Sequence, residues 1–142
     1  MQVLRKLNTD RGLGFELLGA KDHPEAALMV QAGRADAYGM DDILLYGIRA
    51  SAPNPAELAV VGESIQVEPY AIMLRKDDPS FKKLVDDTLA ALIKSGEFEA
   101  LYKKWFQSPI PPKGINLNVP IGASFKKIIA NPTSSGDPKD YQ

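Results

Sequence analysis

The chain has 142 residues, 44% of them hydrophobic, and its 17 basic and 18 acidic residues give a net charge of −1. This length supports one domain with a hydrophobic core, and the composition is that of an ordinary globular protein. The near-neutral charge gives no electrostatic basis for binding nucleic acid or an anionic membrane, and no apolar run has the length of a membrane span. The absence of cysteine excludes disulfides and thiolate metal sites.

In the first half of the chain, apolar periodicity and turn residues predict helices alternating with strands. The predicted helices are 2–8, 22–32 and 42–49, and the predicted strands are 15–18, 35–40 and 58–61. Because a strand, helix, strand order brings strands into one layer with helices packed on it, the fold class predicted is α/β.

The stretch from Asp22 to Asp42 organises this half. Asp22 is the expected N-cap of a helix, Glu25 its capping-box partner, and Gly33 the left-handed residue that ends the helix. The strand 35–40 then ends at Asp41. Since ligands of open α/β sheets bind at the carboxyl ends of strands, we expect Asp41 in a binding site, with the helix start at 22–23 beside it.

The second half is predicted to be mainly helical. Residues 65–70 are expected to be extended because Pro69 disfavours helix before it, and 70–74 has the composition of a strand. Asp78 is the expected N-cap of a long helix that Gly96 ends. Further helices are predicted at 97–106 and 124–130, and the polar residues 131–142 are expected to fray.

Several short pieces of the chain, in their order and spacing, resemble a known family. They are Ala20-Lys21-Asp22-His23, Gly33-Arg34-Ala35, Met40-Asp41-Asp42-Ile43-Leu44-Leu45, the run from Tyr70 to Pro79, Gly96-Glu97, Lys104-Trp105-Phe106 and Pro109-Ile110-Pro111-Pro112. In them the sequence is similar to the extracellular solute-binding proteins that serve polar amino acid ABC transporters, and most of all to the glutamate/aspartate-binding branch. The resemblance covers nearly the whole chain, but it is to the second half of the family's longer chain.

The resemblance implies a type II periplasmic-binding-protein-like fold, truncated to most of the second lobe and the C-terminal helices of the first lobe. Residues 1–68 are then second-lobe α/β structure, 69–130 are the portion that returns to the first lobe with a strand and helices, and 131–142 are a flexible tail. A periplasmic location is implied as well, although the sequence shows no signal peptide. The implied partner of a full-length parent is an ABC permease.

The resemblance also implies two ligand contacts. Asp41 matches the aspartate that binds the α-ammonium of the ligand, and His23, the only histidine, matches a residue of the acidic amino acid branch that contacts the side-chain carboxylate. From the sequence alone, helix capping is the simpler role for Asp41 and exposure at a helix start the simpler role for His23. Tyr70 lies at the presumed hinge, where it would pack or line the pocket.

No catalytic or metal site is predicted, and no cofactor. The chain has no cysteine nucleophile, no serine in a nucleophile-elbow motif, and too few histidines for a metal cluster. A dehydratase-like enzyme on the same scaffold is the alternative class, and a self-associating fragment without ligand binding is a third possibility.

The resemblance implies that the chain holds only half of a ligand site. The arginine that grips the ligand's α-carboxylate, and the serine and threonine donors beside it, match no residue of this sequence. We therefore expect weak or absent binding of an acidic amino acid by this chain. We also expect a homodimer or a domain-swapped assembly, because apolar faces that absent strands would cover are left exposed.

Overall fold

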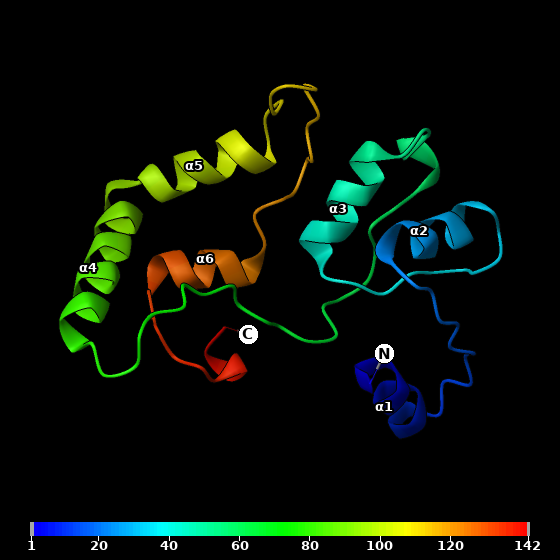
Figure 1. Cartoon of the computed structure of the whole chain (residues 1–142), viewed down its shortest axis with the longest axis horizontal. Coiled ribbons are helices and arrows are strands. Elements are labelled where there is room, and N and C mark those ends of the chain that lie inside the picture. Colours follow the sequence, from blue (N-terminus) through cyan, green and yellow to red (C-terminus); the bar gives the residue numbers. More distant parts are fainter. Residues whose placement is uncertain (1, 142) are drawn as a thin grey trace. The chain divides into compact units, whose positions relative to one another are not determined.

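A computed structural model of the chain describes residues 2–141, which form two compact units that divide between Val60 and Val61. Figure 1 shows the order of the elements along the chain. The first unit contains α1 (Gln2–Arg11), α2 (His23–Gln31), α3 (Asp42–Ser51) and the short 3-10 helix η1 (Pro55–Glu57). The second unit contains α4 (Pro79–Ser95), α5 (Glu97–Phe106), α6 (Ala123–Ala130) and the 3-10 helix η2 (Pro138–Tyr141).

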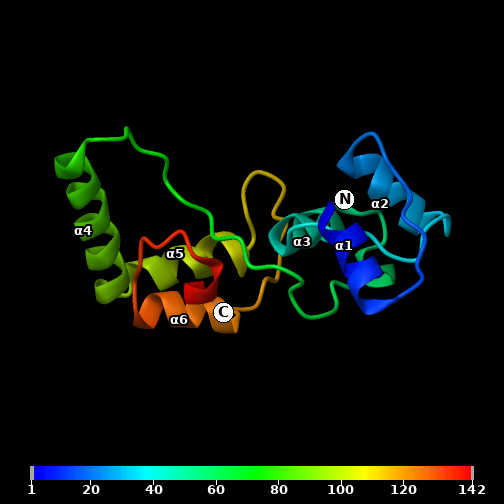
Figure 2. The ribbon, with the colours of Figure 1, turned by 90° about the horizontal axis from the view of Figure 1, so that it is seen from below.

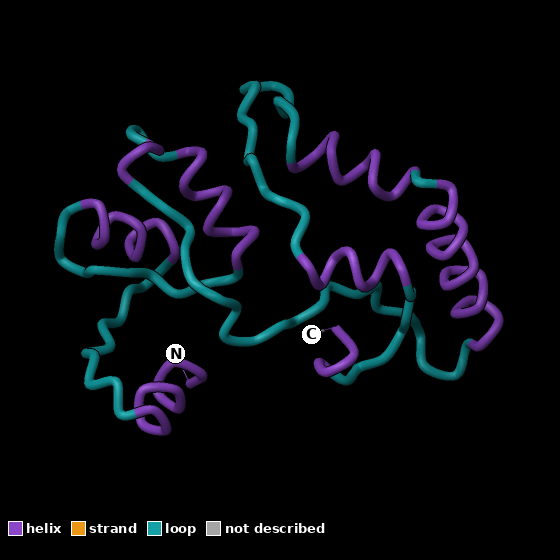
Figure 3. Tube along the Cα trace, turned by 180° about the vertical axis from the view of Figure 1, so that it is seen from behind, coloured by secondary structure: helices purple, strands orange, loops and turns teal. Residues whose placement is uncertain are grey.

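The predicted strands are not formed. Within residues 2–141 the only β pairing is an isolated antiparallel bridge between Ile110 and Ile115, and Figure 3 shows helices and loops but no strand. The predicted strands 15–18, 35–40, 58–61 and 70–74 are non-helical, as their composition requires, but no ladder pairs them. The predicted sheet layer is therefore not formed among residues 2–141 of this structure.

The strand predictions fail because a strand, unlike a helix, needs a partner. A helix satisfies its own backbone hydrogen bonds, whereas a strand depends on a neighbouring chain. In two places a side chain takes the neighbour's role. The Asn8 amide donates to the carbonyl of Phe15 at 2.8 Å and accepts from its N–H at 3.2 Å, and the Arg49 guanidinium donates to the carbonyl of Leu58 at 2.8 Å.

The helices form where local signals predict them. Asp22 caps α2 by accepting from the Glu25 N–H at 2.9 Å, and Gly33 follows the helix with φ of 67°. The Glu25 carboxylate accepts from the N–H of Lys21 at 2.7 Å, so the reciprocal half of the expected capping box is displaced by one residue. At α4, Asp78 accepts from the Phe81 N–H at 3.1 Å.

A single glycine joins α4 to α5. Gly96 has φ of 82° and ψ of −2°, the left-handed conformation that ends α4, and it is also the residue before the first turn of α5. The bend between the two helices is visible in Figure 1. Because side chains are disfavoured in this conformation, glycine at 96 lets two helices follow one another without a linker.

An aromatic cluster connects α5 to α6. The rings of Phe98 and Phe125 stack with centroids 5.6 Å apart, and Tyr102 lies 4.4 Å from Phe125 and 4.7 Å from Phe106. Figures 1 and 2 both place α6 alongside α5. Val119, in the connection between the two helices, is 6% exposed and donates its N–H to the carbonyl of Phe106 at 3.0 Å. These contacts hold α6 and the connection before it against α5.

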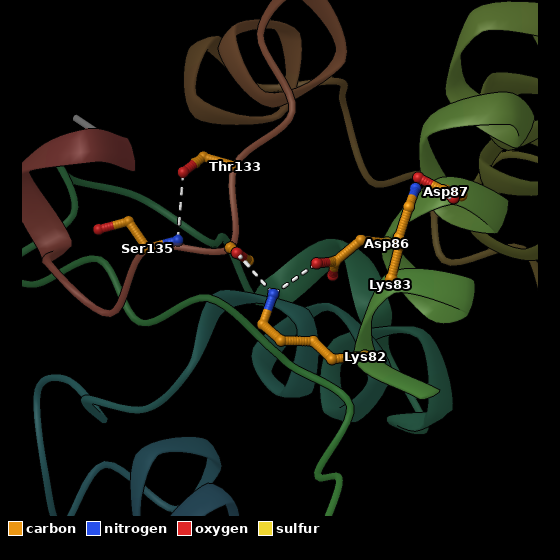
Figure 4. A network of polar contacts seen from close by, with 7 residues as sticks. Lys82, Lys83, Asp86, Asp87, Thr133 and Ser135 are labelled. Carbon is orange, nitrogen blue, oxygen red and sulfur yellow. Dashed lines mark hydrogen bonds and ion pairs between the residues drawn. The ribbon is translucent and has the colours of Figure 1, made fainter. Parts of the chain in front are cut away.

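The tail after α6 contains η2 and an apolar anchor, although its composition is polar. Tyr141 is 5% exposed, and its hydroxyl donates to the carbonyl of Ser135. Figure 4 shows Lys82 of α4 reaching the tail, where its ammonium lies between the Asp86 carboxylate and the Ser134 hydroxyl, 3.1 Å away. The tail is thus connected to α4 of its own unit.

The chain exposes more surface than compact domains of the sizes of its two units would. Two independent compact units of these sizes would expose roughly 8,700 Å². The chain exposes 10895 Å², and Val119 and Tyr141 are the only side chains among residues 2–141 that are buried. Large apolar side chains of the segment before α4 are exposed, namely Val61, Ile65, Tyr70, Ile72 and Met73.

Candidate functional site

The two predicted ligand contacts belong to the first unit, and helix ends position both of them. His23 is the first residue of α2, where the Asp22 cap fixes the backbone. Asp41 directly precedes α3. Both side chains are exposed.

Tyr38 brings the two predicted contacts into one cluster. The His23 Nδ1 atom lies 2.6 Å from the Tyr38 hydroxyl, and the two ring centroids are 6.3 Å apart. Burial raises the pKa of the Tyr38 hydroxyl, and the negative charge of Asp41 raises it further. Asp41 is therefore close enough to act electrostatically on the residue that His23 contacts.

The side chain of Asp41 does not cap α3. Asp41 occupies the N-cap position with φ of −54° and ψ of 132°, but its carboxylate makes no capping hydrogen bond. The neighbouring Asp42, the first residue of α3, accepts from the Ile43 N–H at 2.7 Å. The capping role that the sequence alone favoured for Asp41 is thus not what the structure shows, and a helix-terminal hydrogen bond falls to Asp42 instead.

Tyr38 belongs to this cluster, and sequence reasoning did not single it out. It lies in the apolar run 35–40, where an aromatic residue is most simply part of a core. The available signal was its position, three residues before Asp41 and at the end of the same non-helical segment. The contact with His23 spans 15 residues of sequence, so no local pattern reports it.

Glycine at position 39 lets α1 pack against this segment. A Cβ atom added to Gly39 would lie 3.1 Å from the Leu4 Cδ1 atom, so the Leu4 side chain occupies the space that a side chain at 39 would need. The backbone on either side of Gly39 carries Tyr38 and Met40. The first helix therefore supports the segment that carries the cluster.

Tyr70 is in the second unit and is 78% exposed, within the long non-helical segment before α4. Its predicted hinge or pocket role remains a prediction.

The surface of α5 has a shallow depression lined by Glu97, Ala100, Leu101 and Lys104. These four residues come from one helix, and none belongs to the predicted site.

Residues 2–141 contain no group of three or more His, Cys, Asp or Glu side chains placed to hold a metal ion. No helix among them combines the length and the apolar character needed to cross a membrane.

Comparison with known proteins finds relatives over most of the chain. It is 46% identical over 132 residues to the L-glutamate/L-aspartate-binding protein of Pseudomonas aeruginosa, covering 93% of this chain and 44% of the relative. It is 44% identical over 130 residues to the glutamate/aspartate import solute-binding protein of Escherichia coli K12, covering 92% of this chain and 43% of the relative. A glutamine-binding protein of a Bacillus subtilis ABC transporter is 26% identical over 91 residues, covering 64% of this chain and 32% of the relative.

The chain spans less than half the length of the Pseudomonas and Escherichia relatives. Residues 8–108 match the bacterial extracellular solute-binding proteins, family 3. This family implies a periplasmic-binding-protein-like fold, and it consists of solute-binding proteins rather than enzymes, as the sequence predicts. Since the match covers well over half of the 142 residues, the chain belongs to family 3 of the bacterial extracellular solute-binding proteins.

Proposed function

We propose that these residues are a C-terminal portion of the amino acid binding component of an ABC import system, with an acidic amino acid as ligand. The observation that carries the proposal is the His23–Tyr38–Asp41 cluster, which gathers the two predicted ligand contacts in one unit. The printed names of the Pseudomonas and Escherichia relatives, both glutamate/aspartate-binding, support the choice of ligand. A periplasmic location and a permease partner go with this proposal.

Each contact has a distinct chemical role. The Asp41 carboxylate accepts from the ligand's α-ammonium, a charge-assisted pair that is stronger than a neutral hydrogen bond. His23 donates from its imidazole to the side-chain carboxylate of the ligand, which favours glutamate and aspartate over neutral or basic amino acids. The proposed contacts include no arginine for the ligand's α-carboxylate, because the arginine of the family's first lobe has no counterpart among these residues.

The 142-residue chain is therefore expected to bind acidic amino acids weakly or not at all. Loss of a charge-assisted partner costs about 2–5 kcal/mol of affinity, which is roughly two to four orders of magnitude. Calorimetric titration of the chain with glutamate, aspartate and glutamine measures this. Micromolar or tighter binding of glutamate would contradict the half-site proposal.

A chimeric protein tests the ligand contacts themselves. Residues 2–142 replace the matched segment of the Pseudomonas relative, so that the rest of that protein supplies the remaining contacts. We expect the chimera to bind glutamate and Asp41→Asn to lower its affinity by at least about tenfold. Asp36→Asn, in the same segment but outside the cluster, is the matched control. Equal effects of the two substitutions would overturn the role of Asp41.

We also propose the finer architecture that the resemblance implies. Residues 1–68 correspond to the second lobe of a type II fold, 69–130 to the portion that returns to the first lobe, and 131–142 to a tail. Tyr70 then packs at the crossing between lobes. The strong exposure of Tyr70, Ile72 and Met73 is consistent with a segment that pairs with a neighbour. In this isolated chain that neighbour is a second copy, which gives a homodimer or a domain-swapped assembly.

The alternative of a dehydratase-like enzyme has no support in the family, which is one of solute-binding proteins. Turnover of glutamate or aspartate by the chimera, measured by the loss of substrate over time, would reopen it. The alternative of a self-associating fragment is the outcome in which the chain assembles and the titrations show no heat of binding.

A further inference from the structure

The contacts of the His23 ring bear on which of its two nitrogens carries the proton. A neutral imidazole has one N–H donor and one bare acceptor nitrogen, and the hydrogen bond at one nitrogen decides what the other can do. His23 Nδ1 lies 2.6 Å from the Tyr38 hydroxyl oxygen, well within hydrogen-bond distance. The Nε2 atom, on the opposite side of the ring, is the one left to meet a ligand.

The direction of this hydrogen bond follows from the groups involved. A phenol hydroxyl is a good donor, and the bare nitrogen of a neutral imidazole is a good acceptor. Tyr38 is half-buried, and burial together with the charge of Asp41 favours the protonated hydroxyl. A hydroxyl that keeps its proton can donate it to Nδ1.

We propose that Tyr38 is a positioning residue that holds neutral His23 in the tautomer with the proton on Nε2. The ring then presents an N–H donor, rather than a bare nitrogen, to an incoming group. A donor at this place recognises a carboxylate oxygen, which can only accept. The use of this donor for a ligand rests on the proposed function, but the tautomer itself does not.

The tautomer can be measured directly in this chain. Because the chain contains one histidine, long-range ¹H–¹⁵N correlation spectra of its imidazole show a single set of side-chain signals. At a pH of about 8.5, where an ordinary imidazole is neutral, we expect a larger Nε2–H fraction than histidine has in an unstructured peptide. A dominant Nδ1–H pattern would overturn the proposal, because Tyr38 would then be the acceptor.

Tyr38→Phe removes the hydroxyl and keeps the ring that packs in the half-buried site. We expect the His23 signals to move to the tautomer ratio of histidine in an unstructured peptide. Tyr46→Phe, a half-buried tyrosine of α3 in the same unit, is the matched control and should leave the ratio unchanged. If Tyr38→Phe loses helicity by circular dichroism, the wild-type ratio is compared with that of an unstructured histidine peptide, and an Nε2–H fraction no larger than the peptide's would refute the proposal. An unchanged ratio in a folded Tyr38→Phe variant would refute the positioning role.

Glutamate binding by the chimera is a second test, independent of the tautomer spectra. In the chimera, Tyr38→Phe is expected to weaken glutamate binding by about tenfold or less, and less than His23→Ala does. Failure of all amino acids to bind the chimera would defeat the proposed function while leaving the tautomer assignment to the spectra. Normal glutamate binding by Tyr38→Phe, together with a shifted tautomer ratio, would mean that the tautomer is not what selects the ligand.

Discussion

At the residue scale, two glycines are expected to respond in opposite directions to the same substitution. Gly96 has φ of 82°, whereas Gly47 lies inside α3, and a Cβ added at either position meets no atom within 4 Å. Only backbone conformation therefore distinguishes them. Gly96→Ala should destabilise the protein by about 1–2 kcal/mol, and Gly47→Ala should stabilise it by about 0.5–1 kcal/mol.

Urea unfolding followed by the helical circular dichroism signal measures both changes. Gly96→Asn is a useful third variant because asparagine tolerates the left-handed conformation better than alanine does. It should therefore lie between wild type and Gly96→Ala. The same sign of change for Gly47→Ala and Gly96→Ala would contradict the conformational explanation.

At the scale of the element, the start of α4 depends on one carboxylate. Hydrogen bonds from the Phe81 N–H and the Ser80 hydroxyl, with a smaller contribution from Arg75, lower the pKa of Asp78. A lowered pKa in the folded state stabilises the charged form, so this contribution is present above the ordinary aspartate pKa of about 4 and is lost as pH falls through the lowered value. We expect α4 helicity to decline with acidification below about pH 4.

Two substitutions of Asp78 separate the effect of its capping hydrogen bond from the effect of its titratable charge. Asn is as good an N-cap as Asp but does not titrate, so Asp78→Asn should reduce the acid-induced loss of helicity. Asp78→Ala removes the acceptor and should lower helicity at neutral pH as well. Circular dichroism across pH checks both expectations, and identical acid profiles for wild type and Asp78→Asn would assign the acid response to other groups.

Much of the helical structure could be predicted from the sequence, whereas the pairing of strands could not. Asp22, Asp78 and Gly96 mark helix ends by chemistry that acts within one turn, so a short stretch of sequence reports it. The strand predictions rested on apolar composition, which marks non-helical segments but does not show which segment a strand would pair with. In the candidate site, the family resemblance pointed to His23 and Asp41. It did not point to Tyr38, because the contact of Tyr38 with His23 is made across a helix and a turn.

At the scale of the whole molecule, exposed apolar surface should determine how the chain behaves in solution. Met73 is 96% exposed and Ile72 59% exposed, in a segment without helix. Burying such side chains between copies is favourable by about 25 cal/mol per Å² of apolar area, which favours association as concentration rises. Sedimentation velocity over a range of concentrations should therefore show dimers or larger species.

Charge placed in this segment should oppose association. The double variant Ile72→Lys, Met73→Lys is expected to shift the sedimentation profile toward monomer because each lysine would have to be buried or paired at the contact. Gln31→Lys adds charge at an exposed position of α2 and serves as the control. A monomeric wild type at high concentration, or equal profiles for all variants, would count against association through this segment.

The hydrogen bonds between Asn8 and Phe15 bear on strand pairing at another point of the chain. Because one amide already supplies both a donor and an acceptor to the Phe15 backbone, an incoming strand at that point exchanges hydrogen bonds instead of adding them. The Asn8 side chain thus competes with any incoming strand for the backbone groups of Phe15. Strand pairing at Phe15 therefore gains little net hydrogen-bond energy. A strand that does pair at Phe15 releases the Asn8 side chain, and α1 is then held to the segment that follows it by its turn alone.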